Sequence, residues 1–308
     1  MSGTTTTRGA GVARAGPWRR LARHRLAALG LAVLAVLFVA VLAAPLVETV
    51  LGLDASAVNL FARAAPPSAA HWLGTDELGR DLLLRLLHGG RVSLLVGFTA
   101  AIASAAIGTL LGLISGYFGG RVDAVIMRFA DGVISLPLLP LLIVLAAVDP
   151  SKLGLPEAIS GSESFSLQRI VVIIALVGWP TVARLVRAAT LSLRQREFVL
   201  VAIAQGFGPA RIMFRHILPN AASPILVATT LTVGNVILFE SVLSFLGLGI
   251  QPPVPSWGNM LTGAQDLISE APALAVWPGM LIFVTVIAFN LLGDGLQSAL
   301  DPRSGANR

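Results

Sequence analysis

The sequence predicts an all-α polytopic membrane protein with six transmembrane helices and with both termini in the cytoplasm. Of its 308 residues, 55% are hydrophobic and only 12% are charged. The mean hydropathy of +0.82 is too high for an ordinary soluble domain. Several apolar runs reach the roughly 20 residues that a helix needs to cross the hydrocarbon of a bilayer. We therefore expect a multi-pass membrane protein.

Charge and cysteine content narrow the class further. The chain carries 22 Lys and Arg residues against 16 Asp and Glu residues, and most of the basic residues fall in segments that this topology places inside. The asymmetry follows the positive-inside rule, so the net charge of +6 predicts membrane orientation rather than a nucleic-acid partner. The chain has no cysteine, which excludes disulfides and thiolate metal sites.

The first two elements are a tail and a span. Residues 1–25 are rich in Thr, Gly, Ala and Arg and predict a flexible cytoplasmic tail. Residues 26–47 form an apolar run that is longer than the roughly 7 to 15 residues of a signal-peptide core. We expect a retained transmembrane helix here; a signal cleaved at residues 41–43 is the alternative.

Residues 48–91 are expected on the outer face. Within them, Thr75 is a candidate N-cap, acidic residues follow it, and leucines at helical spacing end at Gly89 and Gly90. This pattern predicts an amphipathic helix on the membrane surface. Four side chains of this segment are candidate metal ligands: His71, Asp76, Asp81 and His88. Arginines at positions 80, 85 and 91 can instead pair with the acids, so ion pairs are favoured over a metal site.

Five further spans are expected in a helical core, residues 92–298, before a short cytoplasmic tail at 299–308. They cover residues 92–118, 124–148, 170–189, 225–250 and 275–292. Small residues in the 92–118 span predict close helix packing. Pro137 and Pro140 predict a kink in the next span. Arg184 and Arg187 are expected to anchor the inner end of the 170–189 span.

The 225–250 span carries the candidate residues of a transport pathway or gate, Asn235, Glu240, Gly247 and Gly249. A polar side chain within a span usually faces protein or water. Glu240 either lines a pathway or bonds a neighbouring helix, and the sequence leaves both open. A Pro-rich turn follows, and Trp257 after it is expected at the membrane interface.

An inner loop at residues 193–220 is the predicted docking surface. Its apolar run, 198–204, is far too short to cross a bilayer and follows Arg196 and Glu197. An apolar surface rimmed by charge usually binds a partner. The run should therefore be covered by another subunit in the cytoplasm.

Turn-forming residues divide this loop into two short helices. Gly206 and Gly208 predict the end of the first helix. Pro209 suits the first turn of the second helix, and Pro219 is expected to end it. We expect the two helices to meet at a glycine elbow.

The same loop resembles the EAA loop of ABC importer permeases, whose pattern is Glu-Ala-Ala, three residues, Gly, nine residues, Ile-x-Leu-Pro. Ala202 matches the second alanine, Gly206 the glycine, and Leu218 with Pro219 the closing pair. The departures from the pattern are Leu200 at the glutamate, Val201 at the first alanine and His216 at the isoleucine. Without the glutamate, docking is expected to depend on apolar burial.

Two other stretches strengthen this resemblance. Residues 71–81 are similar to the segment after the first span in the second permease of peptide and nickel importers. Residues 243–261, LSFLGLGIQPPVPSWGNML, resemble almost letter for letter the end of the fifth span and the next loop in the same proteins. The chain is identified as a member of the type I ABC importer permeases of the dipeptide, oligopeptide and nickel family. This resemblance implies a multi-pass protein of the inner (plasma) membrane of a bacterial or archaeal cell.

The resemblance implies a half-channel that pairs with a second permease, binds two cytoplasmic ATPase subunits and receives its cargo from an extracytoplasmic binding protein. ATP and Mg²⁺ would lie in the ATPase subunits; this chain would have no catalytic residue and bind no cofactor or metal. Its sole lysine, Lys152, does not lie in a P-loop. The expected coupling residues are Arg196, Glu197, Leu200, Ala202, Gly206, Gly208, His216, Leu218 and Pro219.

Peptide is the expected substrate because peptide transport is the broad use of this family. Nickel or another small solute is the alternative within the family. A secondary transporter or channel is the alternative from another class, and it would need charged groups deep in several spans. Glu240 and Asn235 are the main candidates for such groups.

Overall fold

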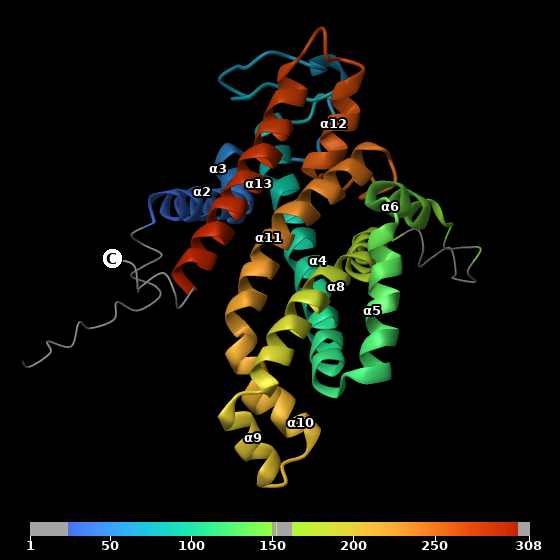
Figure 1. Cartoon of the computed structure of the whole chain (residues 1–308). Coiled ribbons are helices and arrows are strands. Elements are labelled where there is room, and N and C mark those ends of the chain that lie inside the picture. The colour runs from blue at the N-terminus through green and yellow to red at the C-terminus, as the bar shows by residue number, and fades with distance from the viewer. Residues whose placement is uncertain (1–23, 150–151, 153–161, 301–308) are drawn as a thin grey trace, which may run out of the picture.

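The computed structural model describes residues 24–149, 152 and 162–300 (Figure 1). These residues are mainly helical, and apart from one isolated bridge between Thr75 and Asp81 they contain no strand. Most of the two predicted tails lies outside the described residues. The main helices are α2 (Arg25–Leu42), α3 (Ala44–Leu51), α4 (Leu82–Phe118), α5 (Gly120–Ser135), α6 (Leu138–Ala147), α8 (Glu163–Arg194), α9 (Glu197–Ala204), α11 (Leu218–Phe245), α12 (Trp257–Gln265) and α13 (Ala273–Leu300).

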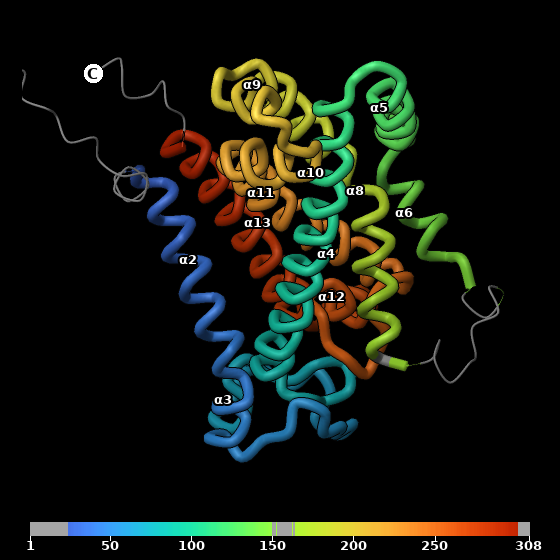
Figure 2. The backbone as a smooth tube through the Cα atoms, turned by 90° about the horizontal axis from the view of Figure 1, so that it is seen from below, coloured from blue at the N-terminus to red at the C-terminus, as the bar shows by residue number. Residues whose placement is uncertain are grey.

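Shorter turns complete the fold: the 3-10 helix η1 (Leu60–Ala62), α10 (Pro209–Arg211) and the π-helical turn η3 (Ile212–Ile217). By length and composition, five helices of the described part can cross a membrane, or six if α5 and α6 form one bent span. The predicted all-α, membrane-spanning class is confirmed. In Figure 2, the α9–α10 hairpin, the start of α2 and the end of α13 lie at one end, and α3 lies at the other.

The surface helix predicted for the outer segment is not found as predicted, and part of it belongs to helix α4. The sequence placed a surface helix between Thr75 and Gly90 and a separate span from residue 92, whereas α4 is one unbroken helix of 37 residues. Its N-cap is Asp81, whose side chain accepts a hydrogen bond of 2.9 Å from the amide of Leu84. Thr75 instead closes a turn, because its hydroxyl oxygen accepts from the amide of Ala65.

The glycine pair expected to end that helix lies inside α4. A Cβ on Gly90 would lie 2.7 Å from the Trp257 ring, and one on Gly89 would lie 3.3 Å from the backbone of Ser256. The two glycines therefore let α12 approach α4. The prediction failed because small residues at a close approach resemble a helix stop in sequence.

Helices α4 and α8 pack along a stripe of small residues, as the composition of the 92–118 span predicted. A Cβ on Gly108 would lie 2.6 Å from the carbonyl oxygen of Trp179, and one on Gly112 would lie 2.6 Å from that of Ala183. In lipid, such backbone proximity replaces the hydrophobic driving force that soluble helices use. This pair forms the centre of the bundle.

The proline-rich span is broken rather than gently kinked. Helices α5 and α6 meet at a bend of 90°. Leu136, the last residue before Pro137, is extended, since a following proline disfavours the helical region. Pro140 lies in the first turn of α6, where its missing N–H removes no helical bond. The break leaves a cavity beside α8 and α11.

The predicted outer loop at 251–273 contains a helix that sequence analysis missed. Helix α12 begins with a capping box, in which Ser256 and Asn259 each bond the other's backbone amide. Trp257 is fully buried, so its expected interfacial position is wrong. Its indole Nε1 donates a 2.9 Å hydrogen bond to the carbonyl oxygen of Leu86. The tryptophan thus locks α12 to α4.

Candidate coupling hairpin and transport cavity

The hairpin between α8 and α11 begins with helix α9, which ends as the sequence predicted. Gly206 has φ of +79°, a left-handed conformation that favours glycine. Its amide donates to Ile203 O (2.9 Å), and that of Phe207 donates to Ala202 O (3.2 Å). This pair of bonds is a Schellman motif. Gly208 differs, because its φ of −67° suits any residue.

One side of α9 is buried against its own chain. Val199 is 0% exposed and Ala202 is 2% exposed. Both pack in a cluster with side chains from α4, α8 and η3, among them Leu113, Val186 and Ile212. The motif alanine therefore fixes the helix to the bundle. This cluster therefore links α9 to α4 and α8.

The other side of α9 is apolar and exposed. Leu200 is 52% exposed, Val201 55% and Ile203 43%. Arg196 and Glu197 are also exposed, at the start of the helix. The described residues contain nothing that covers this face, although its side chains would favour burial by about 1.5 to 3 kcal/mol each. Its composition fits a docking surface.

An aromatic and cationic stack braces the second half of the hairpin. The rings of Phe207 and His216 are stacked with centroids 5.9 Å apart. The guanidinium carbon of Arg211 lies 4.2 Å from the centroid of Phe207. His216, which stands at the motif isoleucine, thus keeps a flat ring in contact with the elbow. Asn220 Nδ2 donates to the carbonyl oxygen of His216 (2.6 Å).

Pro219 does not end the second helix, contrary to prediction. The chain passes from α10 through η3 directly into α11, where Pro219 occupies the first turn. The amide of Leu218 donates to Met213 O, five residues back, which is a π-type bond. This wider turn accommodates a proline that lacks the N–H of a regular helical bond. Leu218 and Pro219 therefore join the hairpin rigidly to α11.

Ion pairs connect α8 to α5 near the same end. Arg187 makes a bidentate pair with Asp123, with Nε–Oδ1 and Nη2–Oδ2 distances of 2.5 Å. Asp123 also accepts a hydrogen bond of 2.5 Å from Ser115 of α4. Arg184 pairs with Asp131 farther along α5. The two arginines predicted as anchors therefore bind acids of a neighbouring helix.

A cavity of about 340 Å³ lies between the α5–α6 break, α8 and α11. Its wall is mostly apolar and includes the polar side chains of Thr181, Thr232 and Asn235. The Thr232 hydroxyl bonds back to Ala228 O. The structure gives Thr181 and Asn235 no side-chain hydrogen bond within the described residues, and both are exposed. Their polar atoms are free to bind a solute.

Glu240 lies away from this cavity. It is 0% exposed, and its carboxylate accepts hydrogen bonds from Ser93 (3.1 Å) and Ser244 (2.7 Å). Ser93 Oγ in turn accepts from the amide of Trp257 (3.1 Å). The structure therefore places Glu240 in a polar network between α4, α11 and α12. This arrangement corresponds to the second alternative, a bond to a neighbouring helix.

The two glycines beyond α11 shape its end. Gly247 has φ of +74° and its amide donates to Ser244 O. A Cβ on Gly249 would lie 2.5 Å from the amide nitrogen of Ser244, so this glycine allows the chain to fold back on α11. Neither residue lines the cavity beside Asn235.

The outer acids form ion pairs, as the sequence favoured. Asp76 binds Arg80 (2.7 Å) and Arg85 (3.0 Å), and all three side chains are buried. His71 Nδ1 lies 2.9 Å from Asp81 Oδ2, and His88 bonds Glu48. Among the described residues, no group of three or more His, Asp or Glu side chains could hold a metal ion.

Comparison with known proteins gives the class first. The MetNI methionine ABC transporter, solved in inward-facing conformations, matches with a TM-score of 0.55 over 70% of this chain and 97% of the other. At 19% identity, this match shows the fold alone. The fold is that of an ABC importer permease.

The family follows from sequence. Residues 108–305 match the model of the binding-protein-dependent transport system inner membrane component. Residues 15–67 match the N-terminal TM domain of oligopeptide transport permease C. The dipeptide transport system permease protein of Alkalihalophilus pseudofirmus is 41% identical, over 93% of this chain and 90% of its own. The chain belongs to the family of permease components of binding-protein-dependent ABC transport systems.

Two further relatives match this chain over a similar share of its length. The glutathione transport system permease protein of Pectobacterium atrosepticum is 42% identical, over 93% of this chain and 90% of its own. The oligopeptide transport system permease protein of Bacillus subtilis is 37% identical, over 92% and 88%. The match extends over nearly the whole chain in each case.

Some functional residues escaped sequence reasoning. The acids Asp123 and Asp131 were not proposed as partners of the arginines, because a pair 64 residues apart leaves no local pattern. Thr181 lies on a regular apolar span and has no flanking signal. Helical spacing could have predicted that the 198–204 run has a buried and an exposed side, because Val199 and Ala202 are three residues apart.

Proposed function

We propose that this chain forms half of the translocation pathway of an ATP-driven peptide importer. The relatives just described include permeases named for dipeptide, oligopeptide and glutathione transport, which favours a peptide over nickel. The observation that carries the proposal is the exposed apolar face of α9 on a helix outside the bundle. A transporter driven by its own ion binding has no use for such a face.

The partners in this proposal are a second, related permease, two cytoplasmic ATPase subunits and an extracytoplasmic binding protein. ATP and Mg²⁺ belong to the ATPase subunits, and this chain contributes no catalytic residue. The exposed Leu200, Val201 and Ile203 enter a pocket of the ATPase, while Arg196 and Glu197 form the charged rim. Because Leu200 replaces the motif glutamate, the contact depends mainly on apolar burial.

Motion of the ATPase reaches the cavity through a contiguous set of contacts. Displacement of α9 acts on α8 through Val199 and Ala202. Helix α8 then acts on α5 through the Arg187–Asp123 pair. Helix α5 ends at the 90° break beside the cavity. The break is the hinge at which the pathway opens and closes.

The cavity beside the break is the proposed wall of the pathway. Thr181 and Asn235 supply a hydroxyl and an amide that bond the N–H and C=O groups of a peptide backbone. The second permease closes the open side. Much of the selectivity then belongs to the binding protein, because the wall offers few polar groups. Glu240 has a structural role in this proposal.

The test compares Gly206→Val with Gly208→Val in the assembled transporter. A β-branched residue is strained at the φ of +79° at Gly206, whereas the φ of −67° at Gly208 suits it, and both sites have open space around the added Cβ. Co-purification of the ATPase and uptake of a labelled dipeptide are measured separately. Gly206→Val should lower both at least tenfold, and Gly208→Val should retain both. Equal values for the two variants contradict the proposal.

A further inference from the structure

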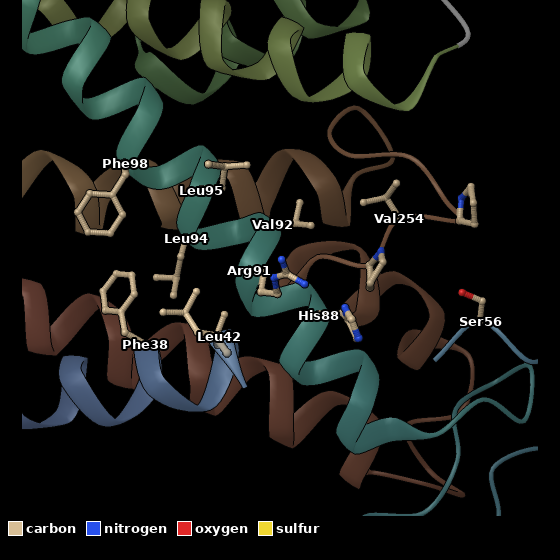
Figure 3. Close-up of a pocket in the computed structure, with 13 residues that line it drawn as sticks. Phe38, Leu42, Ser56, His88, Arg91, Val92, Leu94, Leu95, Phe98 and Val254 are labelled. Carbon is tan, nitrogen blue, oxygen red and sulfur yellow. The ribbon is translucent and has the colours of Figure 1, made fainter. Parts of the chain in front are cut away.

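An apolar groove lies on the side of the bundle formed by α2 and α4 (Figure 3). Its volume is about 670 Å³, within the range of ligand sites in proteins. Figure 3 shows Phe38 of α2 opposite Phe98 of α4 at one end, with Arg91 and His88 toward the other. The two phenyl rings are tilted with centroids 5.4 Å apart, which closes the apolar end.

Helix lengths place this groove in the outer leaflet. At 1.5 Å per residue, the ring pair lies about 20 Å from Arg25 along α2 and about 30 Å from Phe118 along α4. Either count puts the rings in the outer half of a hydrocarbon core of about 30 Å. Arg91 lies about 10 Å farther out along α4, at the level of the lipid headgroups.

Arg91 is the cationic group of the groove. It is exposed, and the structure gives it no ion pair or hydrogen bond among the described residues. The other titratable groups nearby bind one another, because His88 Nε2 lies 3.0 Å from Glu48 Oε2. Glu48 also accepts from the amide of Ala55. A cation beside hydrocarbon gains most from an anion that is itself part of the membrane.

The apolar walls beside Arg91 are open to their surroundings. Leu42 is 68% exposed and Leu95 is 56% exposed, and both line the groove. Figures 1 and 2 place α2 on the opposite side of the bundle from α5 and α6. Under the proposed function, the second permease meets the α5–α6 side, so the α2 side faces lipid.

We propose that this groove holds one phospholipid of the outer leaflet. Its phosphodiester group binds Arg91, and an acyl chain lies over Leu42 and Leu95 and ends at the Phe38–Phe98 pair. The lipid fills the space between α2, α4 and the turn at Val254. It thereby joins the first span to the core of the permease.

The first test measures phospholipid retained by the purified full transporter. Wild type, Arg91→Gln and Arg63→Gln are washed with the same detergent and analysed by native mass spectrometry. Arg63 is the matched control, because it is exposed in the outer segment, away from the groove. Arg91→Gln should retain the lipid about fivefold more weakly, and Arg63→Gln should match wild type. Equal retention by all three overturns the proposal.

A second test does not depend on the stability of the arginine variant. The chain has no cysteine, so Leu95→Cys, in a complex whose partner subunits are also free of cysteine, carries a single fluorophore. In nanodiscs made with brominated phospholipid, its emission should be quenched as strongly as that of a label at the lipid-exposed Val36. Absence of quenching, or a crosslink from position 95 to the second permease, overturns the lipid assignment. Absence of quenching leaves the proposed function intact, whereas such a crosslink would also place the second permease on the α2 side.

Discussion

The short helices α9 and α12 lie near opposite ends of the bundle and differ in what covers them. Helix α12 has 9 residues and α9 has 8. In α12, Trp257 is fully buried, and a Cβ on Gly258 would lie 2.6 Å from Ser241. In α9, Leu200 and Val201 are more than half exposed. The described residues cover α12, whereas they leave one side of α9 uncovered.

The interactions around α12 and α9 also differ in their chemistry. At the α12 end, Glu240, Ser93 and the amide of Trp257 form a buried network in which each group has a partner. Such a network fixes one arrangement, because each broken bond leaves a buried polar group unpaired. At the α9 end, apolar contacts and partly exposed ion pairs predominate. Apolar contacts are less directional than such a network, which fits the coupling role proposed for α9.

The largest effect on stability is expected at the outer network. Glu240→Ala should lower the free energy of unfolding by about 3 kcal/mol, because it removes the acceptor to which the Ser93 and Ser244 hydroxyls donate and creates a cavity. Glu240→Gln keeps the volume and the hydrogen bonds, since a serine hydroxyl can turn to accept from the amide, and should cost under about 1 kcal/mol. The stabilities of the two variants are compared by thermal unfolding of the purified complex. An alanine variant as stable as wild type would show that the network is dispensable.

A smaller effect on stability is expected in α9, where substitutions on the buried side and on the exposed side should have different consequences. Val199→Ala removes two buried methyl groups and should cost about 1 to 3 kcal/mol of stability. Val201→Ala, two residues along, should change stability by less than about 0.5 kcal/mol. It should instead weaken ATPase binding, which can be measured by titration of the reconstituted permease pair. If Val201→Ala binds the ATPase as wild type does, the exposed face is not the docking surface.

A small effect on stability is also expected at the α5–α8 ion pair. Arg187→Gln should cost about 1 kcal/mol, because the pair is partly exposed and screened. It should nevertheless lower peptide uptake while ATP hydrolysis persists, since the link from α8 to the broken span is lost. Arg184→Gln is the control, because its pair with Asp131 is about half exposed. The two variants are compared by the ratio of peptide transported to ATP hydrolysed. Equal ratios would remove Arg187–Asp123 from the coupling route.

Sequence reasoning reached the helical class, the Gly206 elbow and the close packing of small residues, because each depends on local pattern. It failed where partners come from distant segments. The doublet Gly89–Gly90 was interpreted as a helix end, because the α12 residues Ser256 and Trp257 that approach it lie far along the chain. Pro219 was expected to stop a helix that a π-type turn carries past it. The roles of Glu240 and Arg187 likewise depended on side chains that no spacing identifies.

Thiol protection at Leu200 would show directly whether an ATPase subunit covers the exposed face of α9. In a transporter free of other cysteines, Leu200→Cys carries the single thiol, placed on the exposed face of α9. Its rate of modification by a membrane-impermeant maleimide is measured in inside-out vesicles with the ATPase subunits bound and after their removal. We expect rapid modification of the bare permease and at least tenfold slower modification of the complex. Equal rates in the two preparations, or modification only from the outer side of the membrane, would contradict it.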